Sequence, residues 1–372
     1  MKIKTVVLTG VLLGRSIVLG TGFGQVPGTR IVPEVGPLKV YQDGRLAARY
    51  RLDAVDHGRV LRHGQGPGMC DDRGAREAIV FEWKGVYYLH YDGAGPKGWL
   101  ACLATSTNLK DWTRHGPVLD LGPKGKMDSA SASSPWVYHD GRWWQMFYLG
   151  TPKTSPAPDL VPAFPYVTMK ARSPSPLGPW EKQYDVVPFT PKPDTYYSTT
   201  ASPGHVLRSG SEFVMFFSGS VLSRGTKRTL GIARTKDLDG AWTLDAEPIV
   251  PLEEQIENSS LYYEKAGKTW WLFTNHIGTD DRGEYTDAVW VYWTHDLEKW
   301  NREQKAVVLD GRNCTWSKNC IGMPSVVQVG RRLAVFYDAP GGTSVSHMNR
   351  DIGLAWLDLP LLPPDGSAGE KK

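Results

Sequence analysis

The sequence predicts an all-β fold: a five-bladed β-propeller with four-stranded antiparallel blades around a central axis. Three observations predict it. The same pair of alternating strands recurs five times, the copies start roughly 60 residues apart, and turn formers and aromatic residues are abundant, with 40 Gly, 27 Pro, 15 Trp, 16 Tyr and 10 Phe. Because one blade cannot bury both of its faces, repeated blades must stack on their neighbours around an axis.

Each copy contains two strands of alternating apolar pattern joined by a tight turn, which predicts a β-hairpin. The five hairpins cover residues 78–92, 135–149, 203–218, 259–275 and 324–338. The first four are followed by a turn that ends in tryptophan, at Trp112, Trp180, Trp242 and Trp300, and the fifth by a strand over residues 352–357. The spacing exceeds the roughly 40–45 residues of WD40-type blades, so we expect long loops that build a pocket on one face.

The two ends of the chain differ from the repeats. In residues 1–25, Lys2 and Lys4 precede an apolar run over residues 5–14, which is typical of a secretory signal peptide and too short to cross a bilayer. We therefore expect an exported protein, periplasmic or extracellular. Residues 26–362 are predicted to form a single propeller domain with an N-terminal arm, and residues 363–372 a flexible polar tail.

Charge and composition restrict the partners. The net charge of +4 comes from 43 basic and 39 acidic residues spread along the chain without a basic run, which argues against a nucleic-acid partner. No later stretch is apolar for long enough to predict a transmembrane span. The many aromatic faces favour an oligosaccharide or polysaccharide as the partner, and the oligomeric state is left open.

The cysteines indicate oxidation rather than metal binding. Cys70, Cys102, Cys314 and Cys320 are an even number in a chain expected to be exported, so we predict a disulfide between Cys314 and Cys320. The other two cysteines, Cys70 and Cys102, could form a second pair. Their spacing does not match that of zinc ligands. We expect neither a metal nor a cofactor.

The chemistry is predicted at the propeller axis. The first strand of each blade starts beside the central channel, so the residues just before each hairpin should face a ligand there. These residues are Glu77, Ser134, Ser202, Glu257 with Asn258, and Met323. Hydrolysis of a glycosidic bond needs two carboxyl groups, one protonated and one ionised, and Glu77 and Glu257 meet that requirement.

The repeats and the segment Glu257-Asn-Ser-Ser-Leu261 resemble the five-bladed propeller glycosidases, especially glycoside hydrolase family 43 and its relatives in families 32, 117 and 130. The resemblance covers roughly residues 70–357 as a repeat pattern. It implies a glycosidase in which Glu257, before the fourth hairpin, is the general acid. The alternative is a glutamate held in a structural salt bridge.

The general base has two candidates. The first catalytic Asp of family 43 aligns with Glu77, whereas the loop before it supplies Asp71 and Asp72. Related propellers with an Asp-x-x-Gly loop entering the first blade favour Asp72. In that case Glu77 would pair with Arg76 or Arg73 and orient the base.

The sequence departs from the family at the third hairpin. Ser202 stands where family 43 has the Asp that tunes the acid, so another carboxylate must raise the pKa of Glu257. Asp128 is a candidate, because it precedes the second hairpin by about the interval that separates Asp72 from the first. It could equally cap a turn.

Polar and aromatic side chains near the strand ends are predicted to bind sugar hydroxyls. They are Arg76, Ser134, Tyr197, Ser202, His205, Asn258, His276 and Asp338. His205 or His276 could instead donate the proton, as a histidine does in family 117, or be a structural residue. Two other functions fit the residues: a carbohydrate-binding propeller without catalysis, and a phosphorylase like some family 130 members, with Arg73 and Arg76 binding phosphate.

Overall fold

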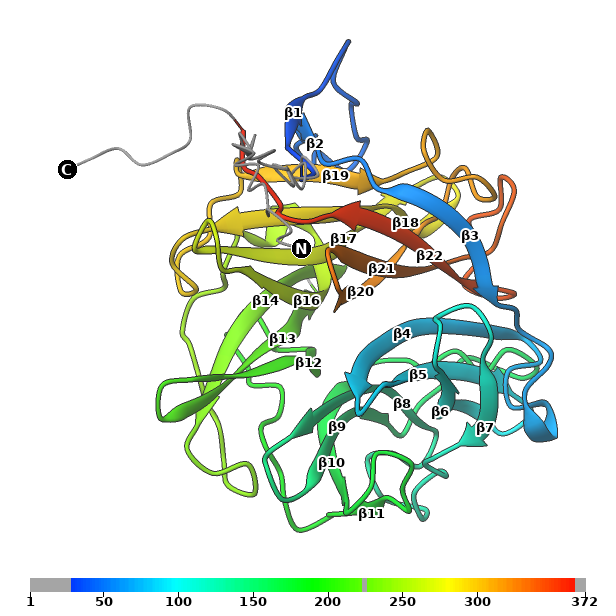
Figure 1. The fold of residues 1–372 in the computed structure, drawn as a ribbon. Helices are drawn as coiled ribbons and strands as arrows, with labels where there is room; N and C mark the ends of the chain where they lie inside the picture. Colours follow the sequence, from blue (N-terminus) through cyan, green and yellow to red (C-terminus); the bar gives the residue numbers. More distant parts are fainter. Residues whose placement is uncertain (1–27, 223–225, 365–372) are drawn as a thin grey trace, which may run out of the picture.

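The computed structural model describes residues 28–222 and 226–364, and these residues form an all-β structure. The predicted signal peptide and most of the predicted tail lie outside the described residues. The strands form five groups that follow one another around the molecule (Figure 1). Two 3-10 turns accompany them, η1 (Pro67–Met69) and η2 (Leu252–Glu254).

Each of the first three groups is an antiparallel meander. The first three contain β4 (Gly74–Trp83), β5 (Val86–Gly95), β6 (Gly98–Ser106) and β7 (Thr113–Pro117); β8 (Ser131–His139), β9 (Trp144–Thr151), β10 (Tyr166–Ser173) and β11 (Glu181–Lys182); and β12 (Thr200–Ser209), β13 (Glu212–Leu222), β14 (Thr226–Thr235) and β15 (Thr243–Leu244). Short parallel pairings of β6 with β8 and of β10 with β12 join these groups into one sheet.

The last two groups recruit strands from the N-terminal part of the chain. They contain β16 (Ile256–Glu264), β17 (Thr269–Asp280), β18 (Gly283–Thr294), β19 (Lys305–Leu309), β2 (Tyr50–Arg51) and β1 (Val32–Pro33); and β20 (Gly322–Val329), β21 (Arg332–Ala339), β22 (Asp351–Asp358) and β3 (Val55–Leu61). β3 pairs antiparallel with β22. The arm expected before residue 70 thus ties the beginning of the chain to its end.

The five predicted hairpins are confirmed, because the first two strands of every group pair antiparallel. At the tip of the first hairpin Lys84 and Gly85 have φ of 52° and 79°. Two successive residues with positive φ form the type of two-residue turn whose twist matches that of the strands. The local sequence therefore sets the register of this hairpin.

The apolar core lies between neighbouring groups. Leu89 of the first group shares a buried cluster with Phe336 of the fifth, and Phe216 of the third group shares one with Leu272 of the fourth. All four side chains are fully buried. Burying a side chain of this size stabilises a fold by roughly 1.5–3 kcal/mol, so each group depends on its neighbours for stability.

The first strand of every group contains a β-bulge at its start. The pairing register shifts between Arg76 and Ile79, Ser133 and Trp136, Ser202 and His205, Glu257 and Ser260, and Gly322 and Ser325. Inside four of these bulges a residue other than glycine has a left-handed backbone: Glu77 (φ 53°), Ser134 (47°), Asn258 (60°) and Met323 (52°). Bulges re-aim side chains, and here they occur where the ligand-facing residues were predicted.

A side chain from the preceding group holds the strained backbone in three of the bulges. The backbone N–H of Glu77 donates to Asp338 Oδ2 at 2.8 Å, that of Ser134 to Asp92 Oδ1 at 2.5 Å, and that of Asn258 to Ser218 Oγ at 3.2 Å. Each acceptor lies on the second strand of its group.

The third group lacks this hydrogen bond for a clear reason. Its bulge contains Pro203, which has no N–H to donate, and the matching position on β9 is Leu149, which has no side-chain acceptor.

Candidate active site

The bulges surround a cavity of about 320 Å³. Its floor contains Arg76, Glu77, Ser133, Ser134, Ser202, Pro203, Glu257, Asn258 and Met323 from the first strands. Residues 161–164 of the loop between β9 and β10 form an apolar wall, and Glu284 of β18 and His347 of the loop before β22 also line the cavity. The remaining lining residues are Asp92, Trp99, Leu149, Tyr166, Arg228 and Ile277. All five groups therefore contribute to one cavity.

Glu257, at the start of β16, lies in the cavity with 17% of its side chain exposed. Burial raises the pKa of Glu257 above its ordinary value. The guanidinium of Arg228, whose Nε lies 3.2 Å from Glu257 Oε1, opposes that shift, while the negative charges of Glu77 and Glu284 add to it. Glu257 therefore retains its proton to a higher pH than a glutamate in water.

Glu77 has a different set of partners. Its Oε1 accepts a hydrogen bond from Arg76 Nη2 at 3.0 Å, and its Oε2 accepts one from Ser134 Oγ at 2.6 Å. Both contacts need acceptor oxygens and suit an ionised carboxylate. The backbone N–H of Glu77 donates to Asp338, which in turn pairs with Arg350 Nη1 at 2.6 Å. This hydrogen bond fixes the backbone position from which the Glu77 side chain extends.

Asp92 lies behind Glu77 and is 2% exposed. It accepts hydrogen bonds from the backbone N–H of Ser134 at 2.5 Å and from Ser134 Oγ at 3.3 Å. Burial, reinforced by the charge of Glu77, raises the pKa of Asp92 well above its ordinary value. Asp92 and Glu77 thus share Ser134, which links the first and second groups.

Arg228 of β14 is 7% exposed and contacts two carboxylates. Besides the contact with Glu257, its Nη1 and Nη2 donate to the two oxygens of Glu284, each at 2.9 Å. On the other side of the cavity Arg76 Nη1 lies 3.4 Å from His347 Nδ1. Burial and the nearby arginines lower the pKa of His347 to about 3, so this histidine is neutral near neutral pH.

Seven of the residues predicted from the sequence line the cavity: Arg76, Glu77, Ser134, Ser202, Glu257, Asn258 and Met323. Asp338 is fully buried one layer behind them, where it binds the backbone of Glu77. The roles assigned to these residues stay predictions.

The structure places the other two carboxylate candidates outside the cavity. Asp72 is exposed, because the preceding turn directs Asp71 inward, where Asp71 pairs with Arg114 at 2.7 Å, and Asp72 outward. Asp128 is fully buried in the second group, where Lys182 Nζ lies 2.5 Å from its Oδ2 and the hydroxyl of Tyr148 2.9 Å from it. A carboxylate held in this way stabilises the second group.

Tyr197, His205 and His276 are also packed away from the cavity lining. Tyr197 is buried against Phe217, with ring centroids 5.6 Å apart. Burial lowers the pKa of His205 to about 4, and its backbone N–H donates to Ser259 Oγ. His276 stacks on Trp290 at 4.1 Å. All three lie at the predicted strand ends, but their side chains point into the core.

The disulfide predicted from the cysteine count was wrong, since all four cysteines are free and buried. The sulfur of Cys314 lies 3.6 Å from the hydroxyl of Tyr337, whereas that of Cys320 lies 3.0 Å from Arg350 Nη2. The two sulfurs therefore have different neighbours.

Sequence reasoning missed Asp92, Arg228, Glu284, His347 and the wall of residues 161–164. Asp92 had a signal, because it is the last residue of the first predicted hairpin (residues 78–92) and pairs with Arg76, just before the first residue of that hairpin. The others come from third strands and long loops, whose position relative to the axis the repeat pattern does not specify.

Residues 28–222 and 226–364 contain no group of three or more His, Cys, Asp or Glu side chains placed to hold a metal ion. In the same ranges, no helix has the length and apolar character that a membrane crossing requires.

Solved structures with a similar fold are glycoside hydrolases. One described simply as a glycoside hydrolase has a TM-score of 0.61 at 16% identity, over 84% of this chain and 93% of its own. A family 117 glycoside hydrolase produced by the marine bacterium Zobellia galactanivorans has a TM-score of 0.57 at 14% identity, over 82% and 90%. A thermostable family-43 glycoside hydrolase has a TM-score of 0.56 at 14% identity, over 81% and 93%. The chain shares the propeller-like fold of these enzymes.

Sequence similarity is more limited. A 1,2-beta-oligomannan phosphorylase from Thermoanaerobacter sp. (strain X514) is 43% identical over 51 residues, which are 13% of this chain and 17% of that protein. The chain thus matches less than a fifth of the length of this curated relative. No family model matches the chain.

Proposed function

We propose that the chain is a five-bladed β-propeller glycosidase that hydrolyses terminal sugars from an oligosaccharide or polysaccharide, with Glu257 as general acid and Glu77 as base. One observation carries the proposal: the two glutamates line the same cavity in opposite environments. Burial raises the pKa of Glu257, whereas Glu77 accepts hydrogen bonds from Arg76 and Ser134 on its two oxygens. Two carboxyl groups whose surroundings differ in this way are suited to acid and base roles.

The five strand groups support the blade count. Buried clusters join the third group to the fourth and the fifth to the first, and β3 completes the fifth group beside β22. Groups that cover one another's faces in this way favour a ring with the bulges at its axis, the arrangement that a propeller requires.

The reaction needs only the groups on the cavity floor. Glu257 gives its proton to the glycosidic oxygen as the bond to the anomeric carbon breaks. Glu77 either takes a proton from the water that attacks that carbon or attacks the carbon itself and is released by water in a second step. In both courses the anomeric carbon gains the hydroxyl of water, and the leaving group keeps the proton that Glu257 donated. The remaining proton of water returns Glu257 to its protonated form, either directly or through Glu77 and solvent.

The shape of the cavity favours a terminal sugar. Residues 161–164 close one side with an apolar wall, and the cavity volume of about 320 Å³ is at the small end for ligand sites. Trp99 of β6 also lines the cavity but is 2% exposed, and the guanidinium of Arg76 lies over its ring, 4.9 Å from the ring centroid. We therefore assign Trp99 to the support of Arg76 rather than to stacking on a sugar.

Turnover of a panel of aryl glycosides and plant or algal oligosaccharides tests the proposal. We expect Glu257→Gln and Glu77→Gln to lose turnover, while Glu82→Gln, an exposed glutamate of the same strand β4, keeps the wild-type rate. Calorimetry on Glu257→Gln should still detect sugar binding. A Glu257→Gln variant with wild-type rates would overturn the proposal. A wild-type protein that binds sugars but turns over no member of the panel would also overturn it, in favour of a carbohydrate-binding propeller.

A phosphorylase is the second candidate, favoured by the 51-residue match to a 1,2-beta-oligomannan phosphorylase. Arg76 lines the cavity and its buried Nε has no partner, so it could bind an anion there. Arg73, by contrast, lies outside the cavity lining and pairs with Asp159 at 2.5 Å. Turnover that requires inorganic phosphate and releases a sugar phosphate would establish this candidate over hydrolysis.

Export remains part of the proposal, on the basis of Lys2, Lys4 and the apolar run over residues 5–14. Fractionation of cells expressing the full chain, with N-terminal sequencing of the product, tests it. A product in the cytoplasm that keeps residues 1–25 would contradict export.

A further inference from the structure

Arg228 poses a problem for a general acid. A guanidinium is positively charged at every working pH, and one placed beside a carboxyl group favours its ionised form. Arg228 Nε lies 3.2 Å from Glu257 Oε1. If this were the only charge pair of Arg228, Glu257 would be expected to lose its proton readily.

Glu284 changes that balance through geometry. It accepts hydrogen bonds from both Nη1 and Nη2 of Arg228 at 2.9 Å, which is the bidentate arrangement that arginine and carboxylate prefer. Only Nε remains for Glu257. The stronger pair is therefore between Arg228 and Glu284, and the charge that Glu257 faces is already partly neutralised.

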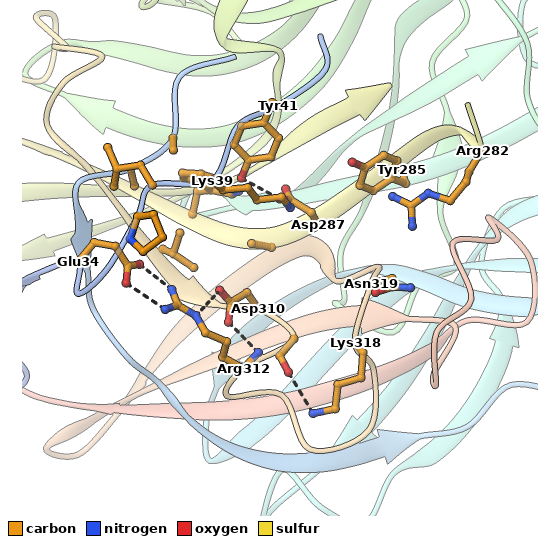
Figure 2. A pocket seen from close by; sticks show the side chains of 18 residues that line it. Glu34, Lys39, Tyr41, Arg282, Tyr285, Asp287, Asp310, Arg312, Lys318 and Asn319 are labelled. Carbon is orange, nitrogen blue, oxygen red and sulfur yellow. Dashed lines mark hydrogen bonds and ion pairs between the residues drawn. The ribbon is translucent and has the colours of Figure 1, made fainter. Parts of the chain in front are cut away.

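Contacts on the opposite face of the β17–β18 hairpin hold Glu284 in this position. Successive residues of a strand point to opposite faces. Glu284 lines the central cavity, while Tyr285 and Asp287 line a second cavity of about 410 Å³ under the N-terminal arm. There Asp287 Oδ2 accepts hydrogen bonds from Lys39 Nζ at 2.7 Å and from the hydroxyl of Tyr41 at 2.8 Å (Figure 2).

A third contact fastens the same hairpin to the arm. The backbone N–H of Thr279, on β17, donates to Asp43 Oδ2 at 3.1 Å. The arm thus anchors the hairpin from behind, on the face opposite to Glu284.

We infer that Glu284 is a positioning residue: by binding the fork of Arg228 it leaves Glu257 able to hold the proton that the reaction uses. The inference rests on the proposed function. Glu284, on β18, is then the third carboxylate of the site beside Glu77 and Glu257. The sequence had suggested Asp128 as the carboxylate that raises the pKa of Glu257.

The other groups that face Glu257 do not take over this role. They are Glu77 and Arg76 from β4, Tyr166 from β10 and His347 from the loop before β22. Glu77 and Arg76 pair with each other at 3.0 Å. Burial raises the pKa of Tyr166 and lowers that of His347 to about 3, so both are neutral near neutral pH.

Glu284→Gln tests the inference by the pH dependence of kcat/KM on an aryl glycoside that the wild type hydrolyses. Glutamine keeps the shape and removes the charge, so Arg228 acts on Glu257 alone and the alkaline limb should move down by about one pH unit or more. Glu284→Asp, which keeps the charge, should leave the limb close to its wild-type position. The double variant Glu284→Gln with Arg228→Gln removes both charges and should move the limb back up.

A second measurement does not depend on turnover. Infrared difference spectra between each protein and its Glu257→Gln counterpart report the protonated carboxyl of Glu257 as a function of pH. We expect this signal to disappear at lower pH in Glu284→Gln than in the wild type. If the Glu257 carboxyl titrates at the same pH in the wild type and in Glu284→Gln, the inference is overturned, even if Glu257 proves essential for turnover. If the titration shifts but the protein has no glycosidase activity, only the proposed function is contradicted.

Discussion

Glu77 and Glu257 start from nearly the same place in two repeats, yet their surroundings differ. Glu77 occupies the left-handed position of its bulge, and Glu257 precedes that position, which is filled by Asn258 in its repeat. Donors reach both oxygens of Glu77, at 3.0 and 2.6 Å. Glu257 has a single guanidinium contact at 3.2 Å, and burial raises its pKa. The repeat determines where the side chain leaves the backbone, and the charged and hydrogen-bonding groups around it, some from the same repeat and some from others, determine its proton affinity.

The two glutamates should differ most clearly when substrates with poor and good leaving groups are compared, and the loss of kcat in these variants is the largest change that we predict. With a poor leaving group, Glu257→Gln should lower kcat about 10²- to 10⁴-fold, the usual contribution of a general acid. With a good leaving group, which departs without a proton, the loss should be much smaller. Glu77→Gln should lose a similar factor with both substrates.

Steady-state rates of the two variants on two aryl glycosides of the same sugar provide the measurement. Equal losses for Glu257→Gln with both leaving groups would show that Glu257 does not protonate the leaving oxygen.

The next largest effect is expected on stability, when the ion pair that holds the backbone of Glu77 is broken. Asp338 and Arg350 are both fully buried and paired at 2.6 Å. Asp338→Asn leaves the charge of Arg350 buried without a partner, which should lower the free energy of unfolding by about 3–5 kcal/mol. Denaturant unfolding measures this loss, and Asp358→Asn, an exposed residue of β22, is the control. A loss below about 1 kcal/mol would mean that this pair does not hold the bulge.

Asp92 provides a pH test. Because its pKa is raised in the folded state, the folded protein binds more protons than the unfolded chain above about pH 4. Stability therefore falls as the pH rises from there through the pKa of the folded state, by at most about 1.4 kcal/mol per pH unit for one proton. Asp92→Asn, which can still accept the backbone N–H of Ser134, should remove this slope. An unchanged slope in melting curves between pH 4 and 7 would show that Asp92 titrates normally.

The smallest effect is expected at Asp72. Its side chain is exposed and lies outside the cavity lining, so Asp72→Asn should keep kcat/KM within about twofold of the wild type and change stability by less than about 0.5 kcal/mol. A loss comparable to that of Glu77→Gln would return the role of base to Asp72.

The repeating framework could be predicted from the sequence. Alternating apolar residues and glycine turns specify hairpins through contacts between residues close in the chain, and the five predicted hairpins are present. The repeat also indicated Glu77 and Glu257, because both stand at the start of a first strand. Their positions follow from local pairing alone.

The other side chains that contact these glutamates could not be predicted, because they come from groups that are distant in the sequence. Asp71 and Asp72 are adjacent in the sequence, but one is buried against Arg114 and the other is exposed, since the turn that holds them is packed by distant residues. Glu284 reaches Arg228 across 56 residues of chain because β14 and β18 lie in neighbouring groups. Contacts of this kind depend on how the groups pack around the axis, and no local pattern encodes them.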